Sequence, residues 1–137
     1  MRILAIDYGD KRTGLAISDE GGKLASRFLT LKNESLEGAV KKISQVITEK
    51  NIAKLVVGLP VGFKAESQQT GKTRQFIAKL KECIEIPIVE INEIFTSKMA
   101  EENLRVAGIK NVKDVIDQEA ARIILQEYLD KEERSAA

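Results

Sequence analysis

The amino-acid sequence predicts an α/β protein with a mixed five-stranded sheet flanked by helices. Over the first third of its 137 residues, apolar residues fall in short segments separated by turns, which is typical of strands. After about residue 35, segments with helical spacing alternate with short apolar strands. Short turns favour antiparallel neighbours, whereas strand–helix–strand units favour right-handed parallel crossovers. The predicted element order is therefore β-β-β-α-β-α-β-α-α.

Three strands are predicted before the first helix. Residues 3–6 form a continuous apolar run, as expected for a central strand that is buried on both faces. Residues 13–18 and 24–31 follow as the second and third strands, separated by turns at 9–12 and 19–22. Because these connections are short, we expect an antiparallel meander.

Helices and strands then alternate. We predict a helix at about 35–50, a strand at 54–58 and a loop from Pro60 to about Ser67. A second helix follows, and residues 87–91 form the fifth strand, where a proline is tolerated at the first position. The expected core face of the second helix is Thr73, Phe76, Ile77 and Leu80.

Two helices complete the predicted fold. Thr96 or Ser97 can cap a helix that runs to about Ala107 and that Gly108 terminates. Asn111 can cap the last helix. The expected apolar stripe of that helix is Val115, Ile116, Ala120, Ile123, Ile124 and Tyr128.

Length and composition predict one domain. We assign it to residues 1–131 and expect a frayed polar tail at 132–137. Hydrophobic residues make up 43% of the chain and aromatic residues only 4%, so the core must be aliphatic. Apolar runs fall well short of the roughly 20 residues of a membrane-spanning helix, and the N-terminal one is too short for a signal peptide. We therefore expect a cytoplasmic protein.

Composition also excludes several kinds of active site. The chain has no histidine and a single cysteine, Cys83, which we expect to pack against the core at a helix end. Catalytic triads, Cys–His pairs and histidine- or cysteine-based zinc sites are thereby excluded. Carboxylates remain, and they prefer Mg²⁺ or Mn²⁺. With a net charge of +1, a nucleic-acid enzyme of this composition would have to gather its basic residues on one face.

Three carboxylates lie where a sheet could bring them together. Asp7 follows the first apolar strand, Glu93 follows the fifth, and Asp117 lies at the edge of the apolar stripe of the last helix. Ligand sites in open α/β sheets gather at the carboxyl ends of strands. Each residue also has a purely structural reading. Asp7 could accept hydrogen bonds from backbone N–H groups of a turn, and Glu93 could be a solvated loop residue. Asp117 could be a carboxylate that the helix dipole stabilises in the first turn, although Asp114 fits that role better.

Carboxylates that converged on one point would repel one another without a cation. With Mg²⁺ or Mn²⁺ they would form a metal site that could activate water and stabilise the leaving oxygen of a phosphodiester bond, a mechanism that needs no histidine. A P-loop is not expected, because its motif requires glycine where this chain has Glu66.

Basic residues near the acidic trio could contact nucleic acid, or could simply be scattered solubilising side chains. Several of them share loops with the three acids. The candidates are Lys11, Arg12, Lys64, Lys72, Arg74, Lys98 and Lys113.

Four sequence blocks resemble the YqgF/RuvX family. Residues 6–14 (IDYGDKRTG) are similar to its opening motif, and residues 56–60 (VVGLP) to its fourth-strand signature. Glu93 with Thr96 and Ser97 resembles its acidic D-E-R-x-T-[ST] motif. The fourth block, residues 117–121 (DQEAA) with 124–129 (ILQEYL), resembles its final helix. The blocks keep the family order over nearly the whole chain.

This resemblance implies a ribonuclease H-like fold. It further implies that Asp7, Glu93 and Asp117 correspond to the family's catalytic and metal-binding acids. The implied activity is a metal-dependent nuclease that matures the 5′ end of pre-16S ribosomal RNA during ribosome biogenesis in the bacterial cytoplasm. The family is also described as Holliday-junction resolvases, through similarity to RuvC.

The sequence departs from the family at one point and leaves alternatives open. Asn92-Glu93-Ile94 stands where the family has Asp-Glu-Arg, which removes one negative charge and a phosphate or carboxylate partner. Precursor rRNA is the favoured partner, and branched DNA is the alternative. Either a monomer or a homodimer is compatible with the sequence, although a junction resolvase would be a symmetric dimer. A non-catalytic RNA-binding module is a further alternative. An actin-like ATPase is disfavoured, because such proteins need two domains of this kind.

Overall fold

The computed structural model describes residues 1–9, 11–32, 35–60, 68–93, 96–110 and 112–136. Their element order matches the predicted one. In chain order, the elements are β1 (Arg2–Tyr8), β2 (Arg12–Ser18), β3 (Ala25–Lys32), α1 (Leu36–Lys50), β4 (Ile52–Pro60), α2 (Gln68–Cys83), β5 (Ile88–Glu93), α3 (Thr96–Val106) and α4 (Val112–Ala136).

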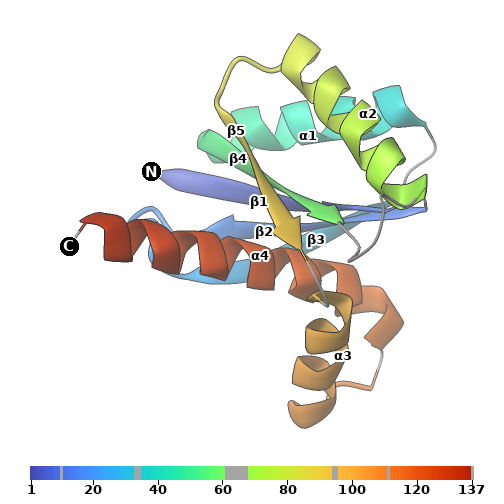
Figure 1. Cartoon of the computed structure of the whole chain (residues 1–137), viewed down its shortest axis with the longest axis vertical. Helices are drawn as coiled ribbons and strands as arrows, with labels where there is room; N and C mark the ends of the chain where they lie inside the picture. The colour runs from blue at the N-terminus through green and yellow to red at the C-terminus, as the bar shows by residue number, and fades with distance from the viewer. Residues whose placement is uncertain (10, 33–34, 61–67, 94–95, 111, 137) are drawn as a thin grey trace.

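The strands form one mixed sheet in the order β3-β2-β1-β4-β5 (Figure 1). The first three strands pair antiparallel, and β1 pairs with β4 and β4 with β5 in parallel. The predicted five-stranded α/β fold is confirmed. Helix α1 connects β3 to β4, and α2 connects β4 to β5. Because β1, β4 and β5 run parallel, their carboxyl ends meet at one edge of the sheet.

Helices cover both faces of the sheet (Figure 1). On one face, α1 and α2 pack against Leu4 and Ile6 of β1; on the other, α4 packs against Ile3 and Ala5. The apolar run at 3–6 therefore supplies side chains to two cores, as a strand buried on both faces should. No helix within the described residues is both long and apolar enough to cross a membrane.

Several element ends differ from the sequence prediction. Asp7 lies within β1 rather than after it, because its backbone still pairs with Gly14 of β2. Glu93 is likewise the last residue of β5, paired with Pro60 of β4. The polar residues predicted to terminate these strands are therefore held by ladder hydrogen bonds. Lys64 and the predicted cap Asn111 lie outside the described residues, as do the side chains of Thr96 and Ser97.

The helix ends give one confirmation and two corrections. Gly108 ends α3 as predicted, with a left-handed φ of 76° that glycine tolerates. Cys83 closes α2 but is exposed rather than packed against the core. The tail expected at 132–137 is helical as far as Ala136, because charged residues that favour helices continue α4 past its last apolar contacts.

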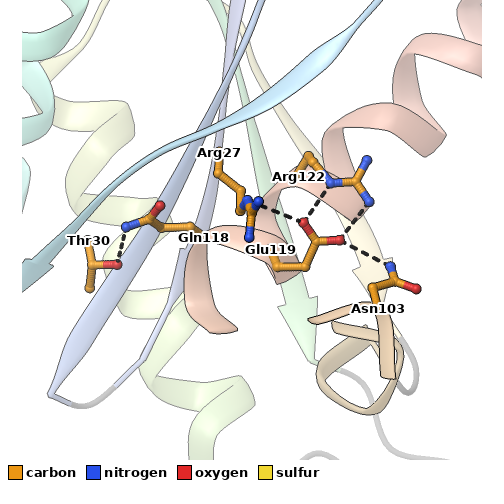
Figure 2. A network of polar contacts seen from close by, with 6 residues as sticks. All are labelled: Arg27, Thr30, Asn103, Gln118, Glu119 and Arg122. Atoms are coloured by element: carbon orange, nitrogen blue, oxygen red, sulfur yellow. Dashed lines mark hydrogen bonds and ion pairs between the residues drawn. The ribbon is translucent and has the colours of Figure 1, made fainter. Parts of the chain in front are cut away.

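A buried carboxylate fixes the first half of α4 (Figure 2). Glu119 is 4% exposed and accepts hydrogen bonds from Arg122 Nε at 2.7 Å, Arg122 Nη2 at 2.6 Å and Asn103 Nδ2 of α3 at 3.1 Å. Arg27 of β3 lies 3.8 Å from the same carboxylate. One residue earlier, Gln118 Nε2 donates to Thr30 Oγ1 at 3.0 Å. The network joins α3, α4 and the edge strand β3.

The charges of this network decide the ionisation of Glu119. Burial alone would raise the pKa of Glu119. Hydrogen bonds from Arg122 and Asn103, with the positive charges of Arg122 and Arg27, outweigh burial and lower its pKa below the usual value. The ionised carboxylate is therefore the form that the folded protein stabilises.

We expect Glu119→Gln to lower the free energy of unfolding at pH 7 by about 1–3 kcal/mol, because Arg122, Asn103 and Arg27 lose a buried, charged acceptor. Urea unfolding of Glu102→Gln is the matched control, since Glu102 makes the same kind of i,i+3 pair with Arg105 on the exposed surface. That control should change stability by under about 0.5 kcal/mol. A glutamate whose pKa is lowered on folding stabilises the protein at pH values above its pKa in the unfolded chain. The effect of Glu119→Gln should therefore shrink as pH falls below about 4. Equal losses for both variants would contradict this account.

The backbone of α4 rests directly on β2. A Cβ added at Gly14 would lie 2.1 Å from the carbonyl carbon and oxygen of Asp117, far inside van der Waals contact. Only glycine permits this approach, and Gly14 is the residue that pairs with Asp7. The glycine therefore places the start of α4 above the end of β1.

Gly14→Ala should cost about 1–3 kcal/mol of stability, because the helix backbone has to move to admit the methyl group. Gly71→Ala is the matched control. A Cβ there meets no described atom within 4 Å, and replacing a helical glycine should stabilise α2 by up to about 1 kcal/mol. Thermal unfolding of the two variants should therefore shift in opposite directions. A Gly14→Ala protein as stable as wild type would show that the contact between α4 and β2 is not tight.

Candidate active site

Three elements bring the acidic residues to one edge of the sheet. Asp7 lies in β1 and Glu93 ends β5, the two strands on either side of β4. Asp117 lies in the second turn of α4, with its backbone over Gly14. These residues are 24 or more positions apart in sequence, and all three are only partly exposed.

Gly58 in β4 leaves room for Glu93 to reach across the sheet. A Cβ at Gly58 would lie 3.0 Å from Glu93 Oε2 and 2.6 Å from Ile124 Cδ1 of α4. The Glu93 carboxylate therefore lies over β4, where a larger residue would displace it. From this place it forms a side-chain hydrogen bond with Asp7.

The acidic neighbours change the ionisation of Asp7. Burial, the negative charges of Glu93 and Asp117, and the hydrogen bond with Glu93 all raise the pKa of Asp7 well above its usual value. Asp7 is therefore favoured as the proton donor in its hydrogen bond with Glu93. Two ionised carboxylates side by side would repel each other, so this arrangement favours the protonated form of Asp7.

The Asp117 side chain forms an ion pair with an arginine. Its Oδ2 lies 3.1 Å from Nε of Arg12, the first residue of β2. The same oxygen is buried and accepts no hydrogen bond from the described residues. Burial raises the pKa of Asp117, and the charge of Arg12 lowers it only in part.

The three predicted acids are thus neighbours but are not gathered around one point. Among the described residues, no group of three or more cysteine, aspartate or glutamate side chains is arranged to hold a metal ion. Asp7 pairs with Glu93, whereas Asp117 pairs with Arg12. The assignment of these acids as catalytic and metal-binding stays a prediction.

The predicted basic residues follow the same strand ends. Lys11 lies between β1 and β2, and Arg12 is the first residue of β2. Lys72 and Arg74 lie in the first two turns of α2, and Lys98 lies in the first turn of α3. All five side chains are exposed. The start of α2 is held beside β1, because Gln69 Nε2 donates to Tyr8 O at 3.0 Å. The side chain of Lys113 lies outside the described part of the chain.

Sequence reasoning missed the residues that shape this edge. Gly14 and Gly58 both fall inside strands, and a glycine inside a strand is a signal of close backbone approach that could have indicated their role. The Glu119–Arg122 spacing was also visible as an i,i+3 pair. Arg27 carries no comparable signal, because its partner is far away in sequence. Asn92, which departs from the family pattern, is exposed beside Glu93.

Comparison with known proteins places this arrangement in a family. A family model described as "RuvX: Holliday junction resolvase" matches residues 1–131. A protein of Chloroflexus aggregans described as "Putative pre-16S rRNA nuclease" is 37% identical over 131 residues, covering 93% of this chain and 92% of its own. A relative from Caldanaerobacter subterraneus with the same description is 38% identical over 140 residues, covering 98% of this chain and all of its own (100%).

Solved structures share the fold. RuvC from T. thermophilus, in complex with a Holliday junction substrate, has a TM-score of 0.61 at 15% identity and covers 97% of this chain and 96% of its own. The fowlpox virus resolvase bound to Holliday junction DNA has a TM-score of 0.60 at 14% identity, covering 96% of this chain and 98% of its own. At these identities the likeness concerns the fold. The chain therefore belongs to the RuvX family, and its five-stranded sheet and helices form the ribonuclease H-like fold expected from the sequence.

Proposed function

We propose that this protein is a nuclease that hydrolyses phosphodiester bonds with a divalent cation, Mg²⁺ or Mn²⁺, held by Asp7, Glu93 and Asp117. One observation carries the proposal: β1, β5 and α4 bring Asp7, Glu93 and Asp117 to one edge of the sheet, where burial and the charges of the other two carboxylates raise the pKa of Asp7. Such a concentration of negative charge costs stability unless a cation compensates it.

The donor set fits a hard divalent cation. All three candidate ligands are carboxylates, which suit Mg²⁺ and Mn²⁺. Gly58 keeps space above β4 for the Glu93 carboxylate, and Asp117 Oδ2 is a buried oxygen that accepts no hydrogen bond from described residues. When bound, the cation would supply positive charge for the attacking water and for the leaving oxygen.

The chain's own residues have separate tasks in this scheme. Asp7, whose pKa is raised by burial and by the neighbouring acids, has to release its proton before it can act as an anionic ligand. The exposed Lys11, Lys72 and Lys98 follow the same strand ends and can hold the phosphate backbone. Hydrolysis then joins a water oxygen to phosphorus and breaks the bond to the leaving oxygen, which takes a proton.

We propose precursor rRNA as the substrate, with processing at the 5′ end of pre-16S rRNA in the cytoplasm. The descriptions of relatives at 37–38% identity support this choice. Four-way DNA is the second candidate, because the matching family model is described as a Holliday junction resolvase. Both can be tested in one assay.

Asp7→Asn should be more stable than wild type at neutral pH in EDTA. A carboxyl whose pKa is raised on folding binds more protons in the folded state, so the free energy of unfolding falls as pH rises from about 4 through the folded pKa. The amide removes this penalty, and the two proteins should converge at lower pH. Thermal unfolding between pH 3 and 8 measures the difference. A wild-type protein that unfolds at a higher temperature than Asp7→Asn at neutral pH would contradict the electrostatic account.

Cleavage of a labelled pre-16S rRNA fragment should require Mg²⁺ or Mn²⁺ and should fall at least about 100-fold in Asp7→Asn and Glu93→Gln, since each variant loses an anionic ligand. Glu90→Gln is the matched control, because Glu90 is an exposed glutamate on the same strand as Glu93. A synthetic four-way DNA junction runs in parallel. Cleavage of the junction alone would favour the second candidate. Binding of RNA without cleavage of either substrate would favour a non-catalytic module and overturn the proposal.

A further inference from the structure

Arg12 forms an ion pair with Asp117, one of the three acids that the proposed cation would bind. It is the first residue of β2, and its backbone carbonyl accepts a hydrogen bond of 3.0 Å from Gly9 N–H, which closes the turn after β1. From this turn its Nε reaches to 3.1 Å from Asp117 Oδ2. The contact joins the β1–β2 turn to the start of α4, directly beside Asp7.

The contact is electrostatic and loosely held. Asp117 Oδ2 accepts no hydrogen bond from described residues, so the Arg12 N–H is not aligned with it despite the short distance. The Arg12 side chain is 44% exposed and that of Asp117 is 24% exposed. Partly solvated pairs of this kind contribute little to stability and weaken with salt. The Arg12 side chain can therefore turn toward solvent, and the buried Asp117 oxygen that it leaves would then need another cation in its place.

The other arginines around the start of α4 are held differently. Arg122 donates two hydrogen bonds to Glu119, at 2.7 and 2.6 Å, and Arg27 faces the same carboxylate. Lys11, the neighbour of Arg12, is exposed, and no described contact joins it to Asp117. Arg12 is thus distinguished by its position against a candidate ligand and not by charge alone.

We propose that Arg12 is a built-in competitor of the divalent cation: it holds Asp117 while no cation is present and has to leave before the three acids can bind one. The inference rests on the proposed function. A guanidinium and a divalent cation at the same carboxylate oxygen repel each other, so each weakens the binding of the other.

Isothermal titration of Mn²⁺ alone into wild type, Arg12→Gln and Lys11→Gln tests the inference. Both variants remove one positive charge from the same turn, and only Arg12→Gln also frees Asp117. We expect Arg12→Gln to bind Mn²⁺ about three- to fivefold more tightly than wild type, and Lys11→Gln less than about twofold more tightly. The difference should shrink in 0.5 M salt. Equal affinities for the two variants would overturn the inference.

Two further variants separate this inference from the proposed function. Arg12→Lys keeps the charge at the end of a shorter, differently shaped donor group, and its Mn²⁺ affinity should fall between those of wild type and Arg12→Gln. Asp117→Asn should abolish the effect of Arg12→Gln. If Mn²⁺ binding is lost in Asp7→Asn but has the same affinity in Arg12→Gln as in wild type, the inference about Arg12 is wrong and the proposed metal site is retained. If neither wild type nor Arg12→Gln binds Mn²⁺, both proposals fall.

Discussion

The close approach of α4 to the sheet is the constraint on which the rest of the site depends. At Gly14, the helix backbone lies where any other residue would place its Cβ. Because Gly14 pairs with Asp7, the same contact that buries the apolar face of α4 also brings Asp117 to the edge where β1 and β5 end. Packing and site geometry therefore share one cause. Gly58 has a similar role in β4, because its lack of a side chain leaves room for the Glu93 carboxylate above that strand.

Much of this architecture could be predicted from sequence, because it follows from periodicity. The apolar run at 3–6 indicated a strand buried on both faces, and the structure divides its side chains between two cores. The strand–helix alternation indicated the parallel half of the sheet. The placement of Asp7 and Glu93 at strand ends was close but not right, since ladder pairing extends both strands through them. Sequence patterns do not show how far a partner strand continues to pair.

The tertiary contacts of the site could not be predicted in the same way. The pairing of Arg12 with Asp117 joins residues more than 100 positions apart, and neither residue signals the other. Arg27 and Thr30 reach α4 only because β3 is the edge strand beside β2. The polar residues after 131 are exposed, but they continue α4 to Ala136, because most of them are good helix formers. Composition predicted solvent exposure there but not conformation.

Two carboxylates in the same helix show why partners matter more than burial. Glu119 is the more buried by residue exposure, yet its pKa is lowered, because four hydrogen-bond or charge contacts compensate its ionised form. Asp117, two residues earlier, has its pKa raised, because burial outweighs the charge of Arg12, the single cation in contact with it among the described residues. A carboxylate that holds a fold together is expected to have its partners within the chain, as Glu119 does. A buried-edge carboxylate left short of them is expected where an external cation completes the set, and this difference favours Asp117 over Glu119 as a ligand.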